Sequence, residues 1–309
     1  MSDKVESIIG YPSLELVTNQ VVEGFITGLH KSPFHGFSVE FAEHRLYNAG
    51  ESTKNIDWKL YGRTDKLFVK KFEEETNLRC LLVVDNSSSM FFPIDGEPSF
   101  TNPNKITFSI YASSVLVQML SRQRDAFGLS LVSDKIDLLT DIKSNFGHKK
   151  YMFQLLEGLL QRRDSENKYQ TNIAPILHQL AEQVHRRSLI IIFTDLLSSQ
   201  NDEQEIISSL QHLKHSKHEV ILFHVNDKSK EINFEFSNRP HRFVDIETSE
   251  EIKLNPQEIR EAYKKAIQQK IENIKVSCDN IRVDFVEADI NQGFDQILIP
   301  YIIKRTKMN

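Results

Sequence analysis

The sequence predicts an α/β protein in which a mostly parallel sheet carries helices on both faces. Two apolar segments without polar alternation, residues 81–84 and 189–193, have the composition of strands buried on both faces. Stretches of helical length separate the predicted strands along the chain, as in a parallel sheet. Asp85 follows the first segment, and Asp195 follows the second one residue further on. Both carboxylates are therefore expected at the carboxyl edge of the sheet, where open α/β sheets bind ligands.

The region that precedes the first buried strand has a different pattern. Residues 1–20 are expected to form an entry segment with a short helix at most, whereas residues 21–71 carry short β-like patterns. Residues 36–41 alternate apolar and polar side chains, as a half-buried strand does. We therefore expect residues 1–76 to form a small β-rich N-terminal module and residues 77–309 to form the main domain.

Helices and strands alternate through the main domain. A loop with three prolines and a glycine spans residues 91–103, and Asn104 then provides an N-cap for the first long helix. Pro175 lies in the first turn of a later helix, where its missing N–H has no partner to lose. The other expected helices cover residues 151–160, 202–214, 256–276 and 294–305, and the other expected strands cover 127–132, 220–225, 281–286 and, at an edge, 136–139.

Composition and charge exclude several classes of protein. Hydrophobic residues make up 39% of the 309 residues and charged residues 26%, as in globular rather than disordered proteins. The formal net charge of −5 provides no general attraction to nucleic acid. Two cysteines are too few for a disulfide framework or a four-cysteine zinc site, and no apolar run reaches the roughly 20 residues of a membrane helix. We therefore expect a cytoplasmic protein without a membrane span.

Oxygen-bearing side chains gather where the two buried strands end. Asp85, Ser87 and Ser89 are spaced two residues apart, so one loop can turn all three towards one point. Thr171 opens a predicted helix, and Asp195 ends the second buried strand. These five side chains come from three loops and can converge on one ion. Carboxylate and hydroxyl ligands suit Mg²⁺, with Mn²⁺ or Ca²⁺ in the same site, rather than zinc.

The pattern Asp-x-Ser-x-Ser, with a distant threonine and a strand-terminal Thr-Asp, resembles the metal-ion-dependent adhesion site of von Willebrand factor A domains. The resemblance implies a von Willebrand factor A-like, or Rossmann-like, fold for the main domain. It also implies a role for each residue. Ser87, Ser89 and Thr171 would reach Mg²⁺ directly, Asp85 directly or through water, and Asp195 usually through water.

A second resemblance covers the N-terminal module as well, and the two together cover roughly residues 20–290. Several motifs are similar to the signature of a bacterial family, domain of unknown function 58, which joins such an upstream segment to the same A-domain core. The resemblance implies a partnership with AAA+ ATPases of the MoxR type and with other A-domain proteins. The motifs are Arg45-x-Tyr47-x-x-Gly50-Glu51, Ile56-Asp57-Trp58, Arg63, Val69-Lys70 and Glu74-Glu75, with Glu51 where the family more often has aspartate.

Three functions are compatible with this set of residues. A dication held mostly by neutral hydroxyls keeps much of its charge and can take a carboxylate of another protein as its last ligand. This favours a non-enzymatic, Mg²⁺-dependent adaptor in the assembly or remodelling of protein complexes. The enzymatic alternative is a phosphotransferase or phosphatase that uses Asp85, but the position two residues on is Ser87 instead of an acidic proton donor. A structural scaffold with an empty metal site is the third possibility.

The loop at residues 91–103 directly follows the predicted metal motif. It carries Asp95 and Glu97. One hypothesis is that one of these carboxylates reaches the ion and occupies the place of a partner. The alternative is a solvated loop that covers the end of the sheet.

Overall fold

The computed structural model describes residues 13–31, 44–46, 58–70, 78–94, 96–161, 173–196, 203–246 and 250–308. The chain divides into two compact units, residues 1–22 together with 78–309, and residues 23–77. The larger unit contains the strands predicted between residues 77 and 309 and the predicted site residues.

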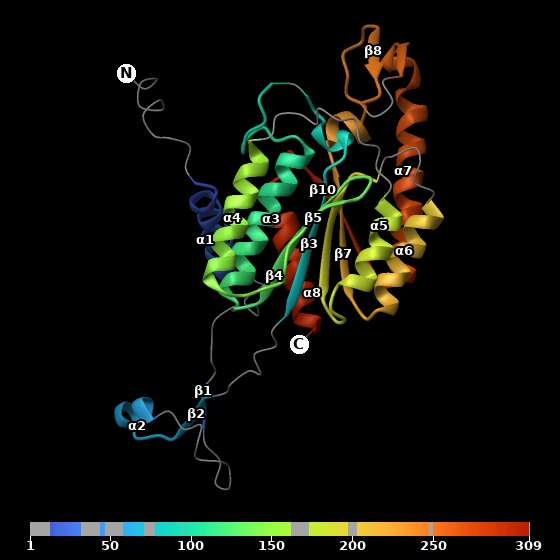
Figure 1. Cartoon of the computed structure of the whole chain (residues 1–309). Coiled ribbons are helices and arrows are strands. Elements are labelled where there is room, and N and C mark those ends of the chain that lie inside the picture. The colour runs from blue at the N-terminus through green and yellow to red at the C-terminus, as the bar shows by residue number, and fades with distance from the viewer. Residues whose placement is uncertain are drawn as a thin grey trace, which may run out of the picture. The chain divides into compact units, whose positions relative to one another are not determined.

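A six-stranded sheet forms the centre of the larger unit (Figure 1). Its strand order is β10-β7-β6-β3-β4-β5, and every neighbouring pair is parallel except β4 and β5, which are antiparallel. The fold class that the sequence predicts, a von Willebrand factor A-like mostly parallel sheet with an edge strand near residue 136, is thereby confirmed. The strands are β3 (Arg79–Asp85), β4 (Ala126–Val132), β5 (Ile136–Leu139), β6 (Leu189–Thr194), β7 (Glu219–Asn226) and β10 (Asp284–Asp289).

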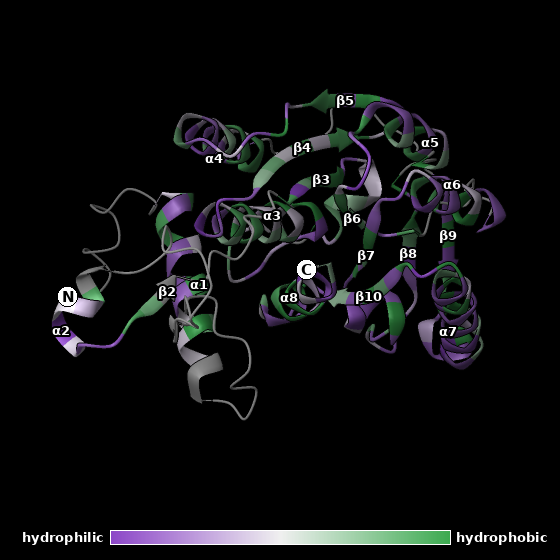
Figure 2. Ribbon diagram, turned by 90° about the horizontal axis from the view of Figure 1, so that it is seen from below, coloured by the Kyte–Doolittle hydropathy of each residue, from purple (hydrophilic) through white to green (hydrophobic). Residues whose placement is uncertain are grey.

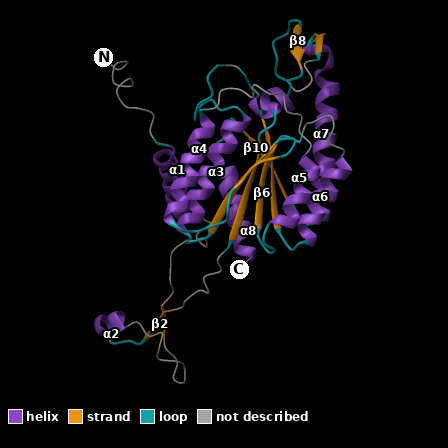
Figure 3. Cartoon of the chain, viewed as in Figure 1, coloured by secondary structure: helices purple, strands orange, loops and turns teal. Residues whose placement is uncertain are grey.

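Helices cover both faces of this sheet (Figures 2 and 3). One layer contains α5 (Ile173–Gln183), α6 (Glu203–His215) and α7 (Pro256–Asn280). The opposite layer contains α3 (Lys105–Arg122), α4 (Phe146–Leu160) and α8 (Asp295–Met308). Two helical layers bury the sheet on both sides, which explains why its central strands show no polar alternation.

The apolar side chains of β3 alternate between the two helical layers. Leu81 and Val83 pack in one cluster with side chains of α5 and α6, whereas Cys80, Leu82 and Val84 point to the other face. All five are fully buried. Cys80 is therefore a packing residue, and burial raises the pKa of its thiol far above the usual range. Burial on both faces fixes the register of β3 and with it the position of the loop that follows.

The N-cap of α3 agrees with the prediction. Asn104 accepts a hydrogen bond at Oδ1 from the backbone N–H of Thr107, at 2.9 Å. Its side-chain amide also donates to the carbonyl oxygen of Phe91, at 3.2 Å. The cap thus ties the start of α3 to the loop that leaves β3, because one side chain bonds to both.

The last strand begins later than the sequence predicts. Helix α7 continues to Asn280, so β10 starts at Asp284 and not at residue 281. Ile271, Ile274 and Cys278 are buried and extend the helical spacing of α7 through its last turns. Ile281 is the C-cap of α7, so the first residues of the predicted strand belong to the turn that ends the helix, and the predicted start of the strand was wrong.

The hairpin of β8 (His241–Val244) and β9 (Glu251–Leu254) was not predicted from the sequence. It follows η3 (Lys228–Ile232), a single turn of π-helix. Aromatic side chains lie between the hairpin and α7, where the ring centroids of Phe234 and Tyr263 are 4.5 Å apart. Arg260 of α7 donates to the carbonyl oxygen of Phe234, at 3.1 Å. η3 follows β7 (Glu219–Asn226) at its carboxyl end, which is the sheet edge that carries the predicted site.

Helix α1 (Leu14–Lys31) is much longer than the short helix expected near the N-terminus. The smaller unit contains β1 (His44–Leu46), α2 (Trp58–Thr64) and β2 (Phe68–Lys70), with β1 antiparallel to β2. The strand predicted at residues 36–41 lies outside the described residues. A β-rich module that ends at residue 76 stays a prediction. Within the described part of the chain, no helix combines the length and apolarity needed to cross a bilayer.

Burial of His224 in β7 predicts how the free energy of unfolding depends on pH. Burial lowers the pKa of His224 from 6.5 to about 4, so the folded state stays neutral where the unfolded chain binds a proton. Stability is therefore lost as the pH falls from about 6.5 towards 4. Between about pH 7.5 and 4.5, we expect the free energy of unfolding to fall by roughly 2 kcal/mol more in the wild type than in His224→Phe. Urea denaturation at both pH values measures this, and an equal pH dependence of the two proteins would contradict it.

Candidate functional site

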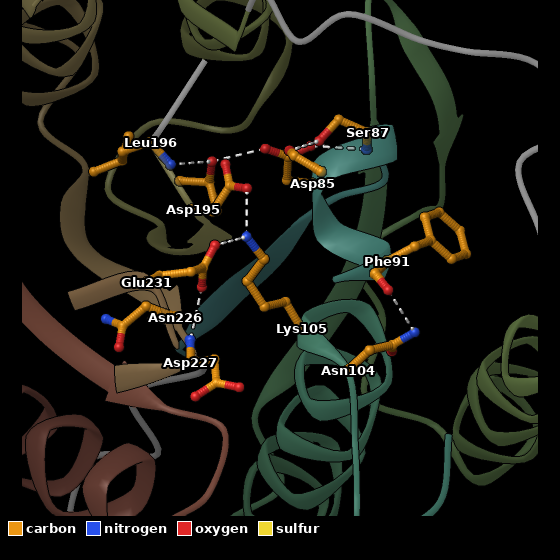
Figure 4. Close-up of polar contacts among 12 residues, drawn as sticks. Asp85, Ser87, Phe91, Asn104, Lys105, Asp195, Leu196, Asn226, Asp227 and Glu231 are labelled. Atoms are coloured by element: carbon orange, nitrogen blue, oxygen red, sulfur yellow. Dashed lines mark hydrogen bonds and ion pairs between the residues drawn. The ribbon is translucent and has the colours of Figure 1, made fainter. Parts of the chain in front are cut away.

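Asp85 lies at the end of β3 and is completely buried. Its Oδ1 accepts a hydrogen bond from the backbone N–H of Ser87, at 2.9 Å, and its Oδ2 accepts one from the hydroxyl of Thr194, at 2.7 Å. The second bond forms because β3 and β6 are parallel neighbours, with Val84 opposite Phe193. The sheet register therefore fixes the orientation of this carboxylate (Figure 4).

The two serines of the motif come together directly after Asp85. The hydroxyl oxygens of Ser87 and Ser89 are 3.1 Å apart. Ser87 precedes η2 (Ser88–Phe91), a short 3₁₀ turn that the fully buried side chain of Met90 anchors in the core. Two hydroxyls and one carboxylate thus lie close together at the carboxyl end of β3.

Asp195 lies at the carboxyl end of β6, between Asp85 and Lys105 in Figure 4. Its Oδ2 accepts a hydrogen bond from Lys105 Nζ, at 2.8 Å. The same ammonium donates to Oε1 of Glu231, at 2.6 Å. The side chains of Lys105 and Asp195 are 1% and 2% exposed and that of Glu231 13%, so the ion pairs lie almost entirely outside solvent. Neither Lys105 nor Glu231 was predicted as a site residue.

The residue after Asp195 has an uncommon backbone conformation. Leu196 has a φ of 54°, in the left-handed region that branched and bulky residues rarely adopt. Such a conformation costs about 1 kcal/mol or more and persists where the surroundings determine it. Leu196 is buried in the cluster formed with α5 and α6, which holds the turn in place. The backbone therefore changes direction sharply just after the second aspartate.

Burial and neighbouring charges shift the pKa values of three side chains in the site. Burial and the nearby charge of Asp195 raise the pKa of Asp85 from 3.8 to about 7. Burial alone would lower the pKa of Lys105, but Asp195 and Glu231 outweigh it and raise that pKa above its usual range. Burial also raises the pKa of Glu231, although Lys105 opposes the shift. Lys105 therefore stays charged and binds the carboxylates on either side of it.

This donor set fits a hard divalent cation. Asp195 and Glu231 share the ammonium of Lys105, and Asp85 accepts hydrogen bonds from Ser87 and Thr194. Carboxylate and hydroxyl oxygens are the ligands that Mg²⁺ prefers. In the described part of the chain, no three His, Cys, Asp or Glu side chains are grouped closely enough to hold a metal by themselves. A site here must use the hydroxyls of Ser87 and Ser89.

Four of the five predicted ligands thus lie at one edge of the sheet. Thr171, the fifth, lies outside the described residues, and its role stays a prediction. Lys105 carries one signal that the sequence reading did not use. A lysine at the first position of a long helix opposes the helix dipole, which indicates a specific anionic partner. Glu231 carries no comparable signal, because its partner lies 126 residues away in sequence.

The loop at residues 91–103 packs against α3 and against the segment that precedes α8. The ring of Phe100 contacts Tyr111 of α3 and Phe294, with centroid distances of 5.0 Å and 5.7 Å. Glu97 is exposed, and Asp95 lies outside the described residues. The hypothesis that one of these carboxylates reaches the ion stays a prediction.

Comparisons with known proteins agree with the family-level expectation. A family model described as "Protein of unknown function DUF58" matches residues 43–273. Uncharacterized proteins of Mycobacterium tuberculosis and Mycobacterium bovis are 22% identical to the chain over 215 residues. The match covers 70% of this chain and 63% of those proteins, so the chain spans less than two thirds of the length of these curated relatives.

Several solved structures are similar to the chain. A conserved hypothetical protein, BatB from Bacteroides thetaiotaomicron, has a TM-score of 0.42 and 14% identity, with coverage of 75% of this chain and 98% of that protein. An aerotolerance-related membrane protein from Bacteroides fragilis has a TM-score of 0.43 and 15% identity, with coverage of 74% and 99%. The SpRpn10 VWA domain has a TM-score of 0.38 and 13% identity, with coverage of 72% and 93%.

Calorimetric titration with MgCl₂ tests the donor set. We expect Ser87→Ala to weaken Mg²⁺ binding at least about tenfold, because it removes one ligand oxygen and leaves the backbone bond to Asp85 in place. Ser113→Ala is the matched control. Ser113 is a buried serine in the middle of α3 whose hydroxyl has no hydrogen-bond partner in the described structure, so its loss should change neither stability nor affinity. Equal Mg²⁺ affinity of the wild type and Ser87→Ala would contradict the assignment.

Proposed function

This chain belongs to the family described as Protein of unknown function DUF58, and from that premise we propose that it is a non-enzymatic, divalent-cation-dependent protein-binding protein. In this proposal Asp85, Ser87, Ser89, Thr171 and Asp195 hold Mg²⁺ or a similar ion. An acidic side chain of another protein completes the coordination. Neutral hydroxyls among the ligands leave the ion enough positive charge to attract that carboxylate.

The observation that carries the proposal is the convergence of the two serine hydroxyls with Asp85. The hydroxyl oxygens lie 3.1 Å apart, beside a buried carboxylate whose pKa is raised by burial and by a second carboxylate. Such a group of oxygens favours a dication over a monovalent ion. Two of its donors are uncharged, so they add ligands without adding negative charge.

The environment of Asp85 argues against its use as a nucleophile. Both carboxylate oxygens already accept hydrogen bonds, one from Ser87 and one from Thr194. These bonds stabilise the ionised form and hold it in one orientation, which suits a ligand better than an attacking group. The proton donor expected two residues further on is replaced by Ser87. The geometry therefore supports a binding role more than phosphoryl transfer.

The proposed partner class comes from the family resemblance. We infer an adaptor role beside an AAA+ ATPase of the MoxR type, in the assembly or remodelling of protein complexes. The metal site would then bind an acidic residue of the ATPase, of a second A-domain protein or of a client. A protein bound in this way should dissociate when the metal is removed, because its carboxylate loses the ion that holds it.

Affinity capture from a lysate of the source organism tests the proposed function. Immobilised wild type and Ser113→Ala should retain the same proteins in MgCl₂ and release them in EDTA, whereas Asp85→Ala and Ser87→Ala should not retain them. Mass spectrometry shows whether a MoxR-type ATPase is among the retained proteins. Capture that is independent of EDTA and of both site variants would refute metal-dependent binding.

A phosphatase assay with a generic phosphate ester distinguishes the enzymatic alternative from the proposed adaptor. We expect no Mg²⁺-dependent turnover above that of Asp85→Asn. Turnover by the wild type that Asp85→Asn abolishes would support the enzyme and overturn the adaptor.

A further inference from the structure

The buried ammonium of Lys105 is the feature of the site that the proposed function does not use. Its side chain is 1% exposed and donates to Asp195 and to Glu231, at 2.8 Å and 2.6 Å. The ring of Phe92 lies under the same nitrogen, 5.7 Å from it. The backbone N–H of Lys105 donates to the carbonyl oxygen of Phe92, at 3.0 Å. Carboxylates, an aromatic face and a backbone bond thus hold the ammonium in one position.

The position of this charge is unusual for a helix. Lys105 is the first residue of α3, where the positive end of the helix dipole disfavours a cation. Burial of an ammonium is also costly unless anions face it closely. Both costs are met only because Asp195 and Glu231 face it from β6 and η3. The arrangement therefore has a specific electrostatic consequence for Asp195.

We propose that Lys105 is a positioning residue that sets the charge of the metal site. This inference rests on the proposed function. By binding Asp195, Lys105 takes up part of the negative charge that would otherwise face the dication. The metal alone is then bound less tightly, and the bound metal keeps more of its attraction for an external carboxylate. Lys105 would thus determine the preference of the loaded site for an acidic ligand.

Glu231 balances Lys105 from the opposite side. Its Oε2 accepts a hydrogen bond from the backbone N–H of Asp227, at 2.7 Å, while its Oε1 binds the ammonium. Without this carboxylate, the whole charge of Lys105 would act on Asp195 and on a nearby dication. Replacement of Lys105 and replacement of Glu231 should therefore change the affinity for the metal in opposite directions.

The test is calorimetric titration of the full chain with MgCl₂ alone. We expect Lys105→Met to bind Mg²⁺ at least about tenfold more tightly than the wild type, because a cation beside the site has been removed. We expect Glu231→Gln to bind it several-fold more weakly, at about the same side-chain volume. If Lys105→Met does not fold, the direction in which Glu231→Gln changes the affinity for Mg²⁺ decides whether the inference holds. Weaker binding by a folded Lys105→Met, or tighter binding by Glu231→Gln, would overturn the inference.

Lys304 provides a matched control. It is also a buried lysine that faces two carboxylates, Glu219 at 2.7 Å and Asp284 at 3.1 Å. These partners lie at the amino ends of β7 and β10, at the opposite edge of the sheet from Asp195. Lys304→Met should therefore leave the affinity for Mg²⁺ unchanged. An equal gain in Lys304→Met and Lys105→Met would show a general effect of net charge and would contradict the inference.

Acetate serves as the probe for the external carboxylate. With Mg²⁺ at saturation, we expect the wild type to bind acetate several-fold more tightly than Lys105→Met, measured by NMR chemical shifts. Equal or tighter binding of acetate by Lys105→Met would overturn the inference. Failure of the proposed function and failure of this inference give different results. A wild type that binds no Mg²⁺ refutes the proposed function. A wild type that binds Mg²⁺ with the same affinity as Lys105→Met and Glu231→Gln refutes only the role of Lys105.

Discussion

Two buried carboxylates at the ends of neighbouring parallel strands impose the main constraint on this protein. Asp85 and Asp195 meet because β3 and β6 pair in parallel register and both end at the same edge of the sheet. Burial, together with the repulsion between the two carboxylates, raises the pKa of Asp85 to about 7. Such a pair is stable only where cations or hydrogen-bond donors face it. The hydroxyl of Thr194, the backbone of Ser87 and the ammonium of Lys105 meet part of that requirement.

The need of the two carboxylates for a further cation is the basis of the proposed metal binding. Lys105 is a cation that the fold supplies permanently, whereas a dication among Ser87, Ser89 and Asp85 would be exchangeable. When one cation is fixed and the other is exchangeable, the protein can couple the presence of the metal to the binding of an acidic partner. The same two carboxylates surrounded by fixed cations alone would be inert packing. The difference between these cases lies in the paired hydroxyls, which offer ligands without charge.

The sequence predicted the parts of the structure that depend on local patterns. β3 and β6 were evident because their apolar runs are buried on both faces, and Asn104 was evident as a cap because its neighbours are helical. The start of β10 was misplaced because Ile281 is the C-cap of α7, so the first apolar residues after the helix belong to the turn that ends it. Glu231 was missed because its ion pair joins residues 126 positions apart, and no local pattern records such a contact, whereas the unfavourable position of Lys105 at the start of α3 was a local signal that was not used.

The central claim is that oxygens from separate loops surround one divalent ion. The most direct measurement is anomalous diffraction from crystals of the protein soaked in MnCl₂. The account predicts a single strong anomalous peak in contact with the hydroxyls of Ser87 and Ser89 and near Asp85 and Asp195, absent from crystals of Ser87→Ala. A peak bound elsewhere, or no peak between these side chains in crystals that diffract well, would contradict it.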